Sequence, residues 1–405
     1  MATVTTPSCA RHTRQTRVSL TGNDAAAEAL RQVNPDVVPV YPITPQTELM
    51  HKFAQFHADG LVDTEIVLVE SEHSAMSAAV GASAAGARVA TATSSQGYAL
   101  MVEICYIAAS YRLPIVMPLV NRALSGPINI HCDHSDAMLA RDTGWIQLWS
   151  ENAQEAYDNT IQAFRIAEHP DVLTPVIVNL DGFILSHTAE TLDILDDPPV
   201  KDFVGAYTPE RYLLDTDRPY SVGALFLPDN YYECRRQQAA AIEAAAPVVE
   251  AVGREYGEIS GRPYGIYEGY RLEDADLAVV ALGSTCGTAK VAVDELRDEG
   301  VKAGLLKPRL YRPFPGPMLI DALRGAKAVA VMDRAISYGL NGGPLFHEIR
   351  SFAYGQLDVP FASYIYGLGG RDIVVDEIKS VYRGLAETLD KGLDASQARY
   401  IGVRE

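Results

Sequence analysis

The sequence contains no C-x-x-C motif, and its few cysteines are scattered. Five cysteines stand at positions 9, 105, 132, 234 and 286, and no two of them are closer than 27 residues. An odd, dispersed set excludes the disulfide framework of small secreted domains, and it excludes an iron–sulfur cluster with all its ligands on this chain. We therefore expect reduced thiols and a cytoplasmic protein.

Long apolar runs and an excess of positive charge are also missing. No stretch approaches the roughly 18 consecutive apolar residues that a membrane-spanning helix needs. Lysine and arginine total 34 against 52 aspartates and glutamates, which gives a formal net charge of −18. A surface of this sign repels phosphate backbones and anionic headgroups, so nucleic acid and membranes are poor partners. The length of 405 residues and a hydrophobic content of 48% instead predict a globular chain of two or three domains.

The first 20 residues contain no acid but carry Arg11, Arg14 and Arg17 among many threonines and serines. They lack the apolar run of a secretory signal and resemble a transit peptide only weakly. We expect residues 1–20 to form a flexible basic arm.

Short apolar runs alternate with helix-like stretches from about residue 22, which predicts βα units around a parallel sheet. Prolines and acidic residues interrupt this alternation over 187–228, and a helix pattern follows over 231–256. The alternation resumes near residue 277. The sequence thus predicts an α/β fold with two parallel-sheet domains, at 21–186 and 266–405, joined at 187–265 by an irregular connection and a helix. The expected strands cover 37–40, 66–69, 89–93, 114–120, 145–149 and 175–180, then 277–282, 302–306, 327–332 and 361–366.

Polar residues follow four strands of the first domain, and ligands of open α/β sheets bind at such strand ends. Prolines stiffen the turn that presents Thr44, Glu70 and Glu72 follow the next strand, and the turn 94–97 and Arg122 follow the other two. Each feature has a plain structural alternative. Thr44 can cap a helix, an acid can favour a helix N-terminus, and Arg122 can form a surface salt bridge. Neither G-x-G-x-x-G nor a Walker motif occurs, which argues against a Rossmann or P-loop site.

Two further patterns are ambiguous. The run His131-Cys132-Asp133-His134 offers metal-ligand types, but adjacent side chains point apart and no partner ligands are evident, so we expect no metal site there. The glycine-rich turns at 283–288, 339–343 and 367–372 can cradle phosphate or simply allow tight turning.

Several strings in these turns are similar to the alpha subunit of pyruvate:ferredoxin oxidoreductase, and the similarity extends over nearly the whole chain from residue 18. The resemblance implies a pyrimidine-type thiamine diphosphate domain followed by a transketolase C-terminal-like domain. The strings are YPITP at 41–45, VESEHSAMSA at 69–78, ATSSQG at 92–97, NRALSGPINIHCDHSD at 121–136, ARDTGWIQ at 140–147, LGSTCGTAK at 282–290 and YIYGLGGRD at 364–372.

The resemblance also implies an activity: a thiamine diphosphate enzyme that oxidises a 2-oxoacid, most simply pyruvate, with coenzyme A to an acyl-coenzyme A, carbon dioxide and two electrons. In multisubunit members the alpha chain supplies the pyrimidine side of the cofactor site, and the beta chain supplies the diphosphate and Mg²⁺ side. The sequence agrees, since it has neither a G-D-G motif nor an Asn-Asn dipeptide. It therefore resembles half of a site.

The matched motifs imply roles for individual residues. Glu72 corresponds to the carboxylate that binds the aminopyrimidine ring nitrogen, which makes it the catalytic residue of the motif, and Pro42 lines the cofactor pocket. Thr44 and Arg122 correspond to residues that hold the 2-oxoacid, with the guanidinium pairing with its carboxylate.

The implied partners are beta, gamma and delta-type subunits, with 4Fe–4S clusters on partner subunits and ferredoxin or another acceptor docking on a cluster-bearing subunit. Two alternatives stay open. The chain can serve the same chemistry on another 2-oxoacid, such as phenylglyoxylate or a branched-chain oxoacid, or it can be a noncatalytic assembly subunit.

Overall fold

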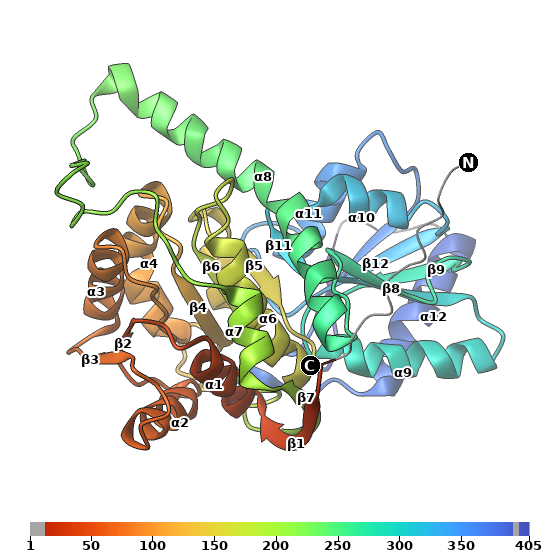
Figure 1. The fold of residues 1–405 in the computed structure, drawn as a ribbon. Helices are drawn as coiled ribbons and strands as arrows, with labels where there is room; N and C mark the ends of the chain where they lie inside the picture. Colours follow the sequence, from red (N-terminus) through yellow and green to blue (C-terminus); the bar gives the residue numbers. More distant parts are fainter. Residues whose placement is uncertain (1–12, 392–396, 405) are drawn as a thin grey trace, which may run out of the picture.

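Two parallel sheets organise the chain, one in each half, and the computed structural model describes residues 13–391 and 397–404 (Figure 1). In the first half, the strands run in the order β11-β5-β6-β4, and β2 pairs with β3 alongside. Residues 89–93, expected as a strand, form only isolated parallel bridges, from Val89 to β2 and from Ala90 and Thr93 to β4. These bridges join the two groups of strands. The strands are β2 (Val37–Val40), β3 (Glu65–Leu68), β4 (Val116–Asn121), β5 (Ile146–Trp149) and β6 (Val176–Asp181).

Helices cover this sheet, and some of them are buried on most of their surface. In α1, four alanines are fully buried, and their small side chains allow this helix to pack closely against α6. β4 and β6 are buried along their whole length, as expected for parallel strands covered on both faces. The helices are α1 (Gly22–Val33), α2 (Thr47–Ala58), α3 (Glu72–Ala84), α4 (Ser95–Ser110), α5 (Ser135–Leu139) and α6 (Ala153–Ala167), with a 3₁₀ turn η1 (Ala140–Asp142) after α5.

The second sheet has the order β14-β13-β12-β9-β10-β8, parallel except for β8 at one edge. The strand β11, which follows β10 in the chain, is not part of this sheet. It pairs antiparallel with β5, so the second half contributes a strand to the first sheet. The strands are β8 (Tyr267–Tyr270), β9 (Leu277–Val280), β10 (Ala303–Pro308), β11 (Leu310–Arg312), β12 (Ala328–Asp333), β13 (Phe361–Ile365) and β14 (Arg399–Tyr400), and the helices are α9 (Thr285–Asp298), α10 (Gly316–Ala322), α11 (Pro344–Ala353) and α12 (Val375–Lys391), with η2 (Leu368–Gly370).

Two segments outside the sheets differ in secondary structure from what the sequence indicates. Within the arm expected at 1–20, residues 15–20 belong to a strand, β1 (Gln15–Thr21), which pairs antiparallel with β7 (Ala189–Leu195). The irregular connection expected from residue 187 begins with β7 and α7 (Asp197–Val204) before it becomes irregular. The remainder of the expected arm, residues 1–12, lies outside the described residues.

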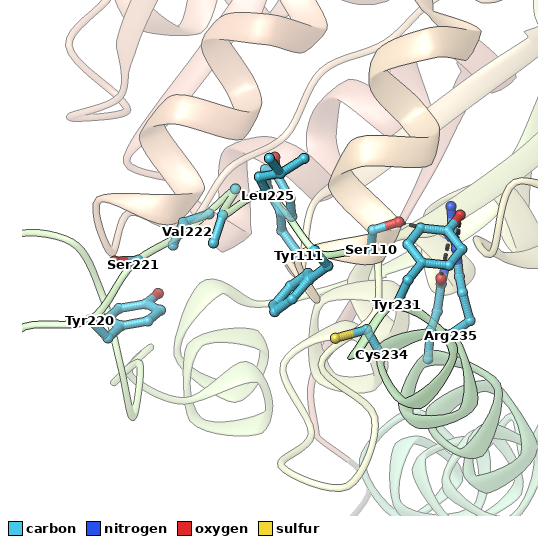
Figure 2. A pocket seen from close by; sticks show the side chains of 13 residues that line it. Ser110, Tyr111, Tyr220, Ser221, Val222, Leu225, Tyr231, Cys234 and Arg235 are labelled. Carbon is cyan, nitrogen blue, oxygen red and sulfur yellow. Dashed lines mark hydrogen bonds between the residues drawn. The ribbon is translucent and has the colours of Figure 1, made fainter. Parts of the chain in front are cut away.

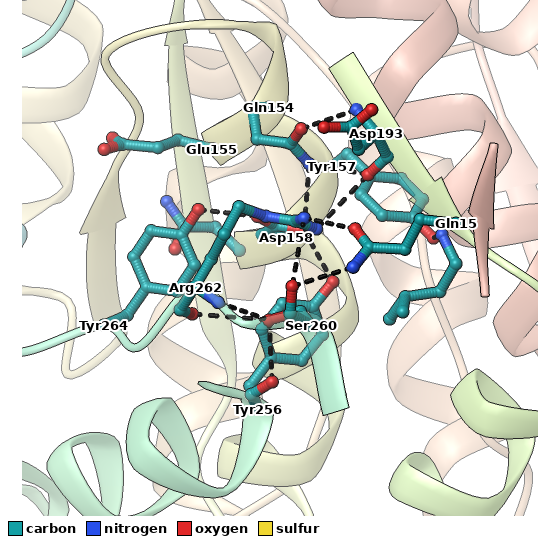
Figure 3. Close-up of polar contacts among 12 residues, drawn as sticks. Gln15, Gln154, Glu155, Tyr157, Asp158, Asp193, Tyr256, Ser260, Arg262 and Tyr264 are labelled. Carbon is teal, nitrogen blue, oxygen red and sulfur yellow. Dashed lines mark hydrogen bonds and ion pairs between the residues drawn. The ribbon is translucent and has the colours of Figure 1, made fainter. Parts of the chain in front are cut away.

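The long helix α8 (Pro228–Ser260) continues through Pro247 and has two different halves. Its N-terminal half projects from the body (Figure 1), whereas its C-terminal half buries Ala245, Val249 and Val252. The fully buried Asp158 of α6 forms hydrogen bonds with residues at the C-terminal end of α8 (Figure 3). Its carboxylate accepts hydrogen bonds from Tyr256 Oη at 2.5 Å and from Arg262 Nε at 2.7 Å. This buried charge is therefore paired, as its burial requires.

Candidate active site

The four turns singled out in the sequence lie at one edge of the first sheet. The strands β3 and β2, residues 89–93 and β4 are neighbours in that order and run parallel. Their carboxyl ends therefore meet at the same edge, where ligands of such sheets bind.

Glu72 begins α3 and is buried, with 7% of its surface exposed. The hydroxyl of Ser71 caps this helix by accepting a hydrogen bond from Ser74 N. The Glu72 carboxylate lies against Gly97, where an added Cβ would stand 2.7 Å from Glu72 Oε1. Burial raises the pKa of Glu72, although a hydrogen bond from its own backbone N–H opposes that rise. Within the described ranges no other residue donates a hydrogen bond to this carboxylate, so it can still accept one from a ligand.

Glu70 has the opposite environment. Its side chain is exposed and accepts a hydrogen bond from the Ser74 hydroxyl, which lowers its pKa. Of the two acids in this turn, Glu72 is the buried one, and burial strengthens its hydrogen bond to a ligand donor.

Arg122 follows β4, and the structure brings it to the turn that contains Thr44. Arg122 Nη1 donates to the Thr44 carbonyl oxygen at 2.9 Å, and Nε donates to Asn129 O at 3.0 Å. Burial lowers the pKa of Arg122, whose residue is 7% exposed. It is therefore not the surface salt bridge considered as an alternative. The side chains of Thr44 and Pro42 are exposed in this turn, and Asn23 Nδ2 donates to Pro45 O at 2.8 Å behind it.

The turn at residues 94–97, which the sequence indicates only as a polar turn at a strand end, connects the surroundings of Glu72 with those of Arg122. The Ser95 hydroxyl donates to Ala123 O at 2.5 Å, directly after Arg122. The carboxylate of Asp136 accepts hydrogen bonds from the backbone N–H groups of both Ser95 and Arg122, each at 2.9 Å. Asp136 is the last residue of the string at 121–136. The sequence does not predict that its carboxylate links the turns at Ser95 and Arg122, because this link depends on residues that are distant in the chain.

The run expected not to hold a metal forms a buried network between the two halves. The ligand atoms of Cys132, His134 and Asp181 lie within 4.8 Å of one another. His134 Nε2 is 2.9 Å from Asp181 Oδ1, and Arg334 Nη1 is 3.6 Å from Asp181 Oδ2. Burial raises the pKa of Asp181, but His134 and Arg334 outweigh it and hold the pKa below its usual range. A fixed guanidinium here repels a cation, so the cluster is better explained as an ion pair.

Two of the glycine-rich turns pack the second half against the first. Gly283 has a φ of +67°, and a Cβ there would stand 2.8 Å from Asp181 Oδ1. At the turn 367–370, Gly369 O accepts a hydrogen bond from Asn129 Nδ2 at 3.0 Å. These glycines allow close approach of two chain segments, which explains their presence without a phosphate.

A cavity of about 580 Å³ lies elsewhere, between the C-terminal end of α4, residues 220–226 and the start of α8 (Figure 2). Its lining is mainly apolar and includes Tyr111, Leu225 and Tyr231. At a rise of about 1.5 Å per residue, α4 places Ser110 about 20 Å from Gly97. This cavity is therefore separate from the strand-end site.

Comparison with known proteins gives consistent matches over both halves of the chain. The family described as "Pyruvate flavodoxin/ferredoxin oxidoreductase, thiamine diP-bdg" matches residues 28–254, and "Pyruvate:ferredoxin oxidoreductase core domain II" matches residues 275–378. The chain is 55% identical to pyruvate synthase subunit PorA of Thermotoga maritima, over 96% of this chain and 98% of the relative. It is 47% identical to the PorA subunit of Methanocaldococcus jannaschii, over 95% and 98%.

A relative with a different printed substrate is also similar. Ketoisovalerate oxidoreductase subunit VorA of Pyrococcus horikoshii is 44% identical, over 92% of this chain and 94% of the relative. Among solved structures, a 2-oxoglutarate:ferredoxin oxidoreductase from Magnetococcus marinus has a TM-score of 0.71 at 22% identity; the match covers 91% of this chain and 65% of that one. A split-gene transketolase has a TM-score of 0.54 at 13% identity, over 91% and 99%. The two structures bear out the expected fold, a thiamine-type domain followed by a transketolase C-terminal-like domain.

Proposed function

Because this chain belongs to the pyruvate:ferredoxin oxidoreductase family, we propose that its strand-end site holds the pyrimidine side of thiamine diphosphate next to a bound 2-oxoacid. The chain is the alpha-type subunit of an oxidoreductase that acts in a multisubunit complex. The observation that carries the proposal is the buried Glu72 carboxylate at the same sheet edge as Arg122, to which no other described residue donates a hydrogen bond.

The residues present fit the pyrimidine end of the cofactor. Bound thiamine diphosphate would supply the carbon nucleophile and the electron sink for decarboxylation. Glu72 would accept a hydrogen bond from a ring nitrogen, and its charge would favour the imino form of the exocyclic amine. Gly97 leaves room for the carboxylate, and Pro42 would border the ring. Because the sequence has no G-D-G motif, we infer that a beta-type partner would hold the diphosphate and Mg²⁺.

Arg122 and Thr44 form the substrate side of the site. The Arg122 guanidinium has already used Nε and Nη1 on backbone carbonyls, which fixes its plane. Its remaining N–H groups pair with the carboxylate of the 2-oxoacid, and the exposed Thr44 hydroxyl donates a hydrogen bond. One cation suits a monocarboxylate, and pyruvate is favoured by the PorA relatives. The VorA relative keeps a branched-chain oxoacid as the second candidate.

The electrons from this reaction must leave the chain. Among the described residues, Cys105, Cys132, Cys234 and Cys286 are free and sit in different elements, so they form no cluster ligand set. We therefore propose that the 4Fe–4S clusters lie on partner subunits, from which electrons reach ferredoxin or another acceptor. No described helix is long and apolar enough to cross a membrane, and free thiols suit the cytoplasm.

The test is an activity screen of the purified complex with coenzyme A and a low-potential acceptor. Acetyl-coenzyme A formation from pyruvate, with lower kcat/KM for 2-oxoisovalerate and phenylglyoxylate, supports the proposal. Preference for a bulky oxoacid would reassign the substrate. Absence of thiamine-dependent turnover with every 2-oxoacid would leave an assembly role and contradict the proposal.

A further inference from the structure

Asp136 is a buried carboxylate that the proposed chemistry does not use. It lies in the first turn of α5 and is fully inaccessible to solvent. Its Oδ2 accepts hydrogen bonds from Ser95 N and Arg122 N, both at 2.9 Å. Its Oδ1 accepts from Asn121 Nδ2 at 3.1 Å and from Ala137 N at 2.7 Å. Both oxygens are thus occupied by N–H donors from three separate segments.

The turn held through Ser95 supports Glu72. Ser95 has a φ of +44°, a left-handed conformation that residues other than glycine rarely adopt. Such a conformation persists only where neighbours enforce it, and here Asp136 and Ala123 O hold Ser95 from two sides. Two residues later, Gly97 contacts the Glu72 carboxylate. A shift of this turn therefore moves the surface on which Glu72 rests.

The other bond of the same oxygen holds the backbone of Arg122. This backbone directs the guanidinium toward the Thr44 turn, where Nη1 meets the Thr44 carbonyl. Asp136 Oδ2 therefore binds two turns at once: the turn that contacts Glu72 and the turn that carries Arg122.

We propose that Asp136 is a positioning residue that locks the turn beneath Glu72 to the turn carrying Arg122, and so fixes the spacing between cofactor and 2-oxoacid. The inference rests on the proposed function for the roles of Glu72 and Arg122. Only an ionised carboxylate can serve four donors. An asparagine here turns its NH₂ toward two N–H groups in either orientation, which breaks one pair of bonds.

The experiment compares Asp136→Asn with wild type in the assembled complex. Burial raises the pKa of Asp136 to about 7, although the N–H bonds from Arg122 and Ser95 oppose that rise. Measurements are therefore made about one unit above this value, where the carboxylate is mainly ionised. The readouts are thiamine diphosphate affinity by calorimetry, thiazolium hydrogen–deuterium exchange, KM for pyruvate, and the melting temperature. A misplacement of about 1 Å can cost about 100-fold in rate, so we expect exchange to slow and KM to rise, each by about tenfold or more.

The matched control is Asp333→Asn in the second half. Asp333 is also buried, and it accepts hydrogen bonds from Leu345 N at 2.8 Å and Phe346 N at 3.1 Å, at the start of α11. This variant should lower the melting temperature without altering exchange or KM. Equal changes in both variants would show that Asp136 acts only through stability and would overturn the inference. So would an assembled Asp136→Asn complex with wild-type exchange and KM.

If the Asp136→Asn complex does not assemble, Ser95→Ala provides the test. This substitution removes the hydrogen bond from the Ser95 hydroxyl to Ala123 O, which joins the same two turns. Slower exchange together with a higher KM supports the tie, and unchanged values overturn it. Glu72→Gln separates this inference from the proposed function. If Glu72→Gln leaves exchange unchanged, the proposed cofactor role fails; if Glu72→Gln slows exchange and Asp136→Asn does not, only the present inference fails.

Discussion

The acids that flank Ser71 have opposite surroundings, although they are two residues apart. Glu72 is buried with a raised pKa, whereas Glu70 is exposed and bonded to Ser74, which lowers its pKa. Burial makes a carboxylate more basic and strengthens its hydrogen bonds to a ligand. The difference follows from the helix start, since α3 begins at Glu72 and directs that side chain toward Gly97.

Glu72→Gln should slow thiazolium hydrogen–deuterium exchange in the complex by roughly 100- to 10,000-fold, the range for a lost acid–base function. The amide keeps the shape but loses the charge that favours the imino form. Glu70→Gln is the neighbouring control and should leave the exchange rate close to that of wild type. A larger loss in Glu70→Gln would mean that the other acid of the pair serves the cofactor.

Arg122→Lys should raise the KM for pyruvate by about 10- to 100-fold, which corresponds to the loss of a charge-assisted contact worth roughly 1.5–3 kcal/mol. An ammonium cannot hold two backbone carbonyls and a carboxylate in one plane. Arg112→Lys is the control, because Arg112 is also partly buried and donates to Val172 O at 2.6 Å and Leu173 O at 3.0 Å, at the far end of α4. Steady-state kinetics on both complexes decides, and an unchanged KM in Arg122→Lys removes this residue from the substrate site.

At the scale of elements, the start of α4 sets the position of Glu72. Gly97→Ala would place a Cβ 2.4 Å from Thr93 Oγ1 and 2.7 Å from Glu72 Oε1, and Glu72 is the more flexible of the two. We expect the carboxylate to move and the affinity for thiamine diphosphate to fall by about tenfold or more, as for a lost charge-assisted hydrogen bond.

Gly81→Ala is the control for Gly97→Ala. Gly81 lies within α3, and no atom stands within 4 Å of a Cβ added there. Alanine should stabilise the helix by about 1 kcal/mol and leave cofactor binding unchanged. Calorimetric titration of the two complexes with thiamine diphosphate distinguishes the variants, and equal affinities would show that Glu72 does not depend on Gly97.

Elements formed by local pattern could be predicted, and those formed by distant pairing could not. Buried runs such as β4 and β6 were identified because they are apolar throughout. The strand β1 was missed because its sequence QTRVSLT is mostly polar and gains its partner, β7, only across the chain. The helix α7 had a usable signal, since Pro198 and Pro199 stand in its first turn, where proline is favoured. In the site, the strand-end turns were predictable, but the link through Asp136 depends on tertiary contacts.

At the scale of the whole molecule, the two halves are interlocked rather than simply joined. β11 from the second half pairs with β5 in the first sheet, and Asp181, at the end of β6, accepts a hydrogen bond from the Ser284 hydroxyl at 2.5 Å. The turn 367–370 reaches Asn129, whose carbonyl oxygen in turn accepts from Arg122. The second half thus supports Arg122, the residue that we propose binds the substrate. In the proposed function, the two halves together provide the pyrimidine side of the cofactor site, and a partner subunit provides the other side.

The isolated chain should therefore bind thiamine diphosphate weakly and show no turnover. Without the partner's ligands for Mg²⁺ and diphosphate, the cofactor loses at least two charge-assisted contacts of roughly 1.5–3 kcal/mol each, so its affinity should fall about 100-fold or more below that of the complex. Titration of the purified chain with thiamine diphosphate and Mg²⁺, followed by the same titration after addition of the beta-type subunit, measures the difference. The Glu72→Gln chain should reduce binding in the complex but change little in the isolated chain, where binding is already weak. Tight binding or pyruvate oxidation by the chain alone would contradict the half-site and would require diphosphate ligands that its sequence does not show.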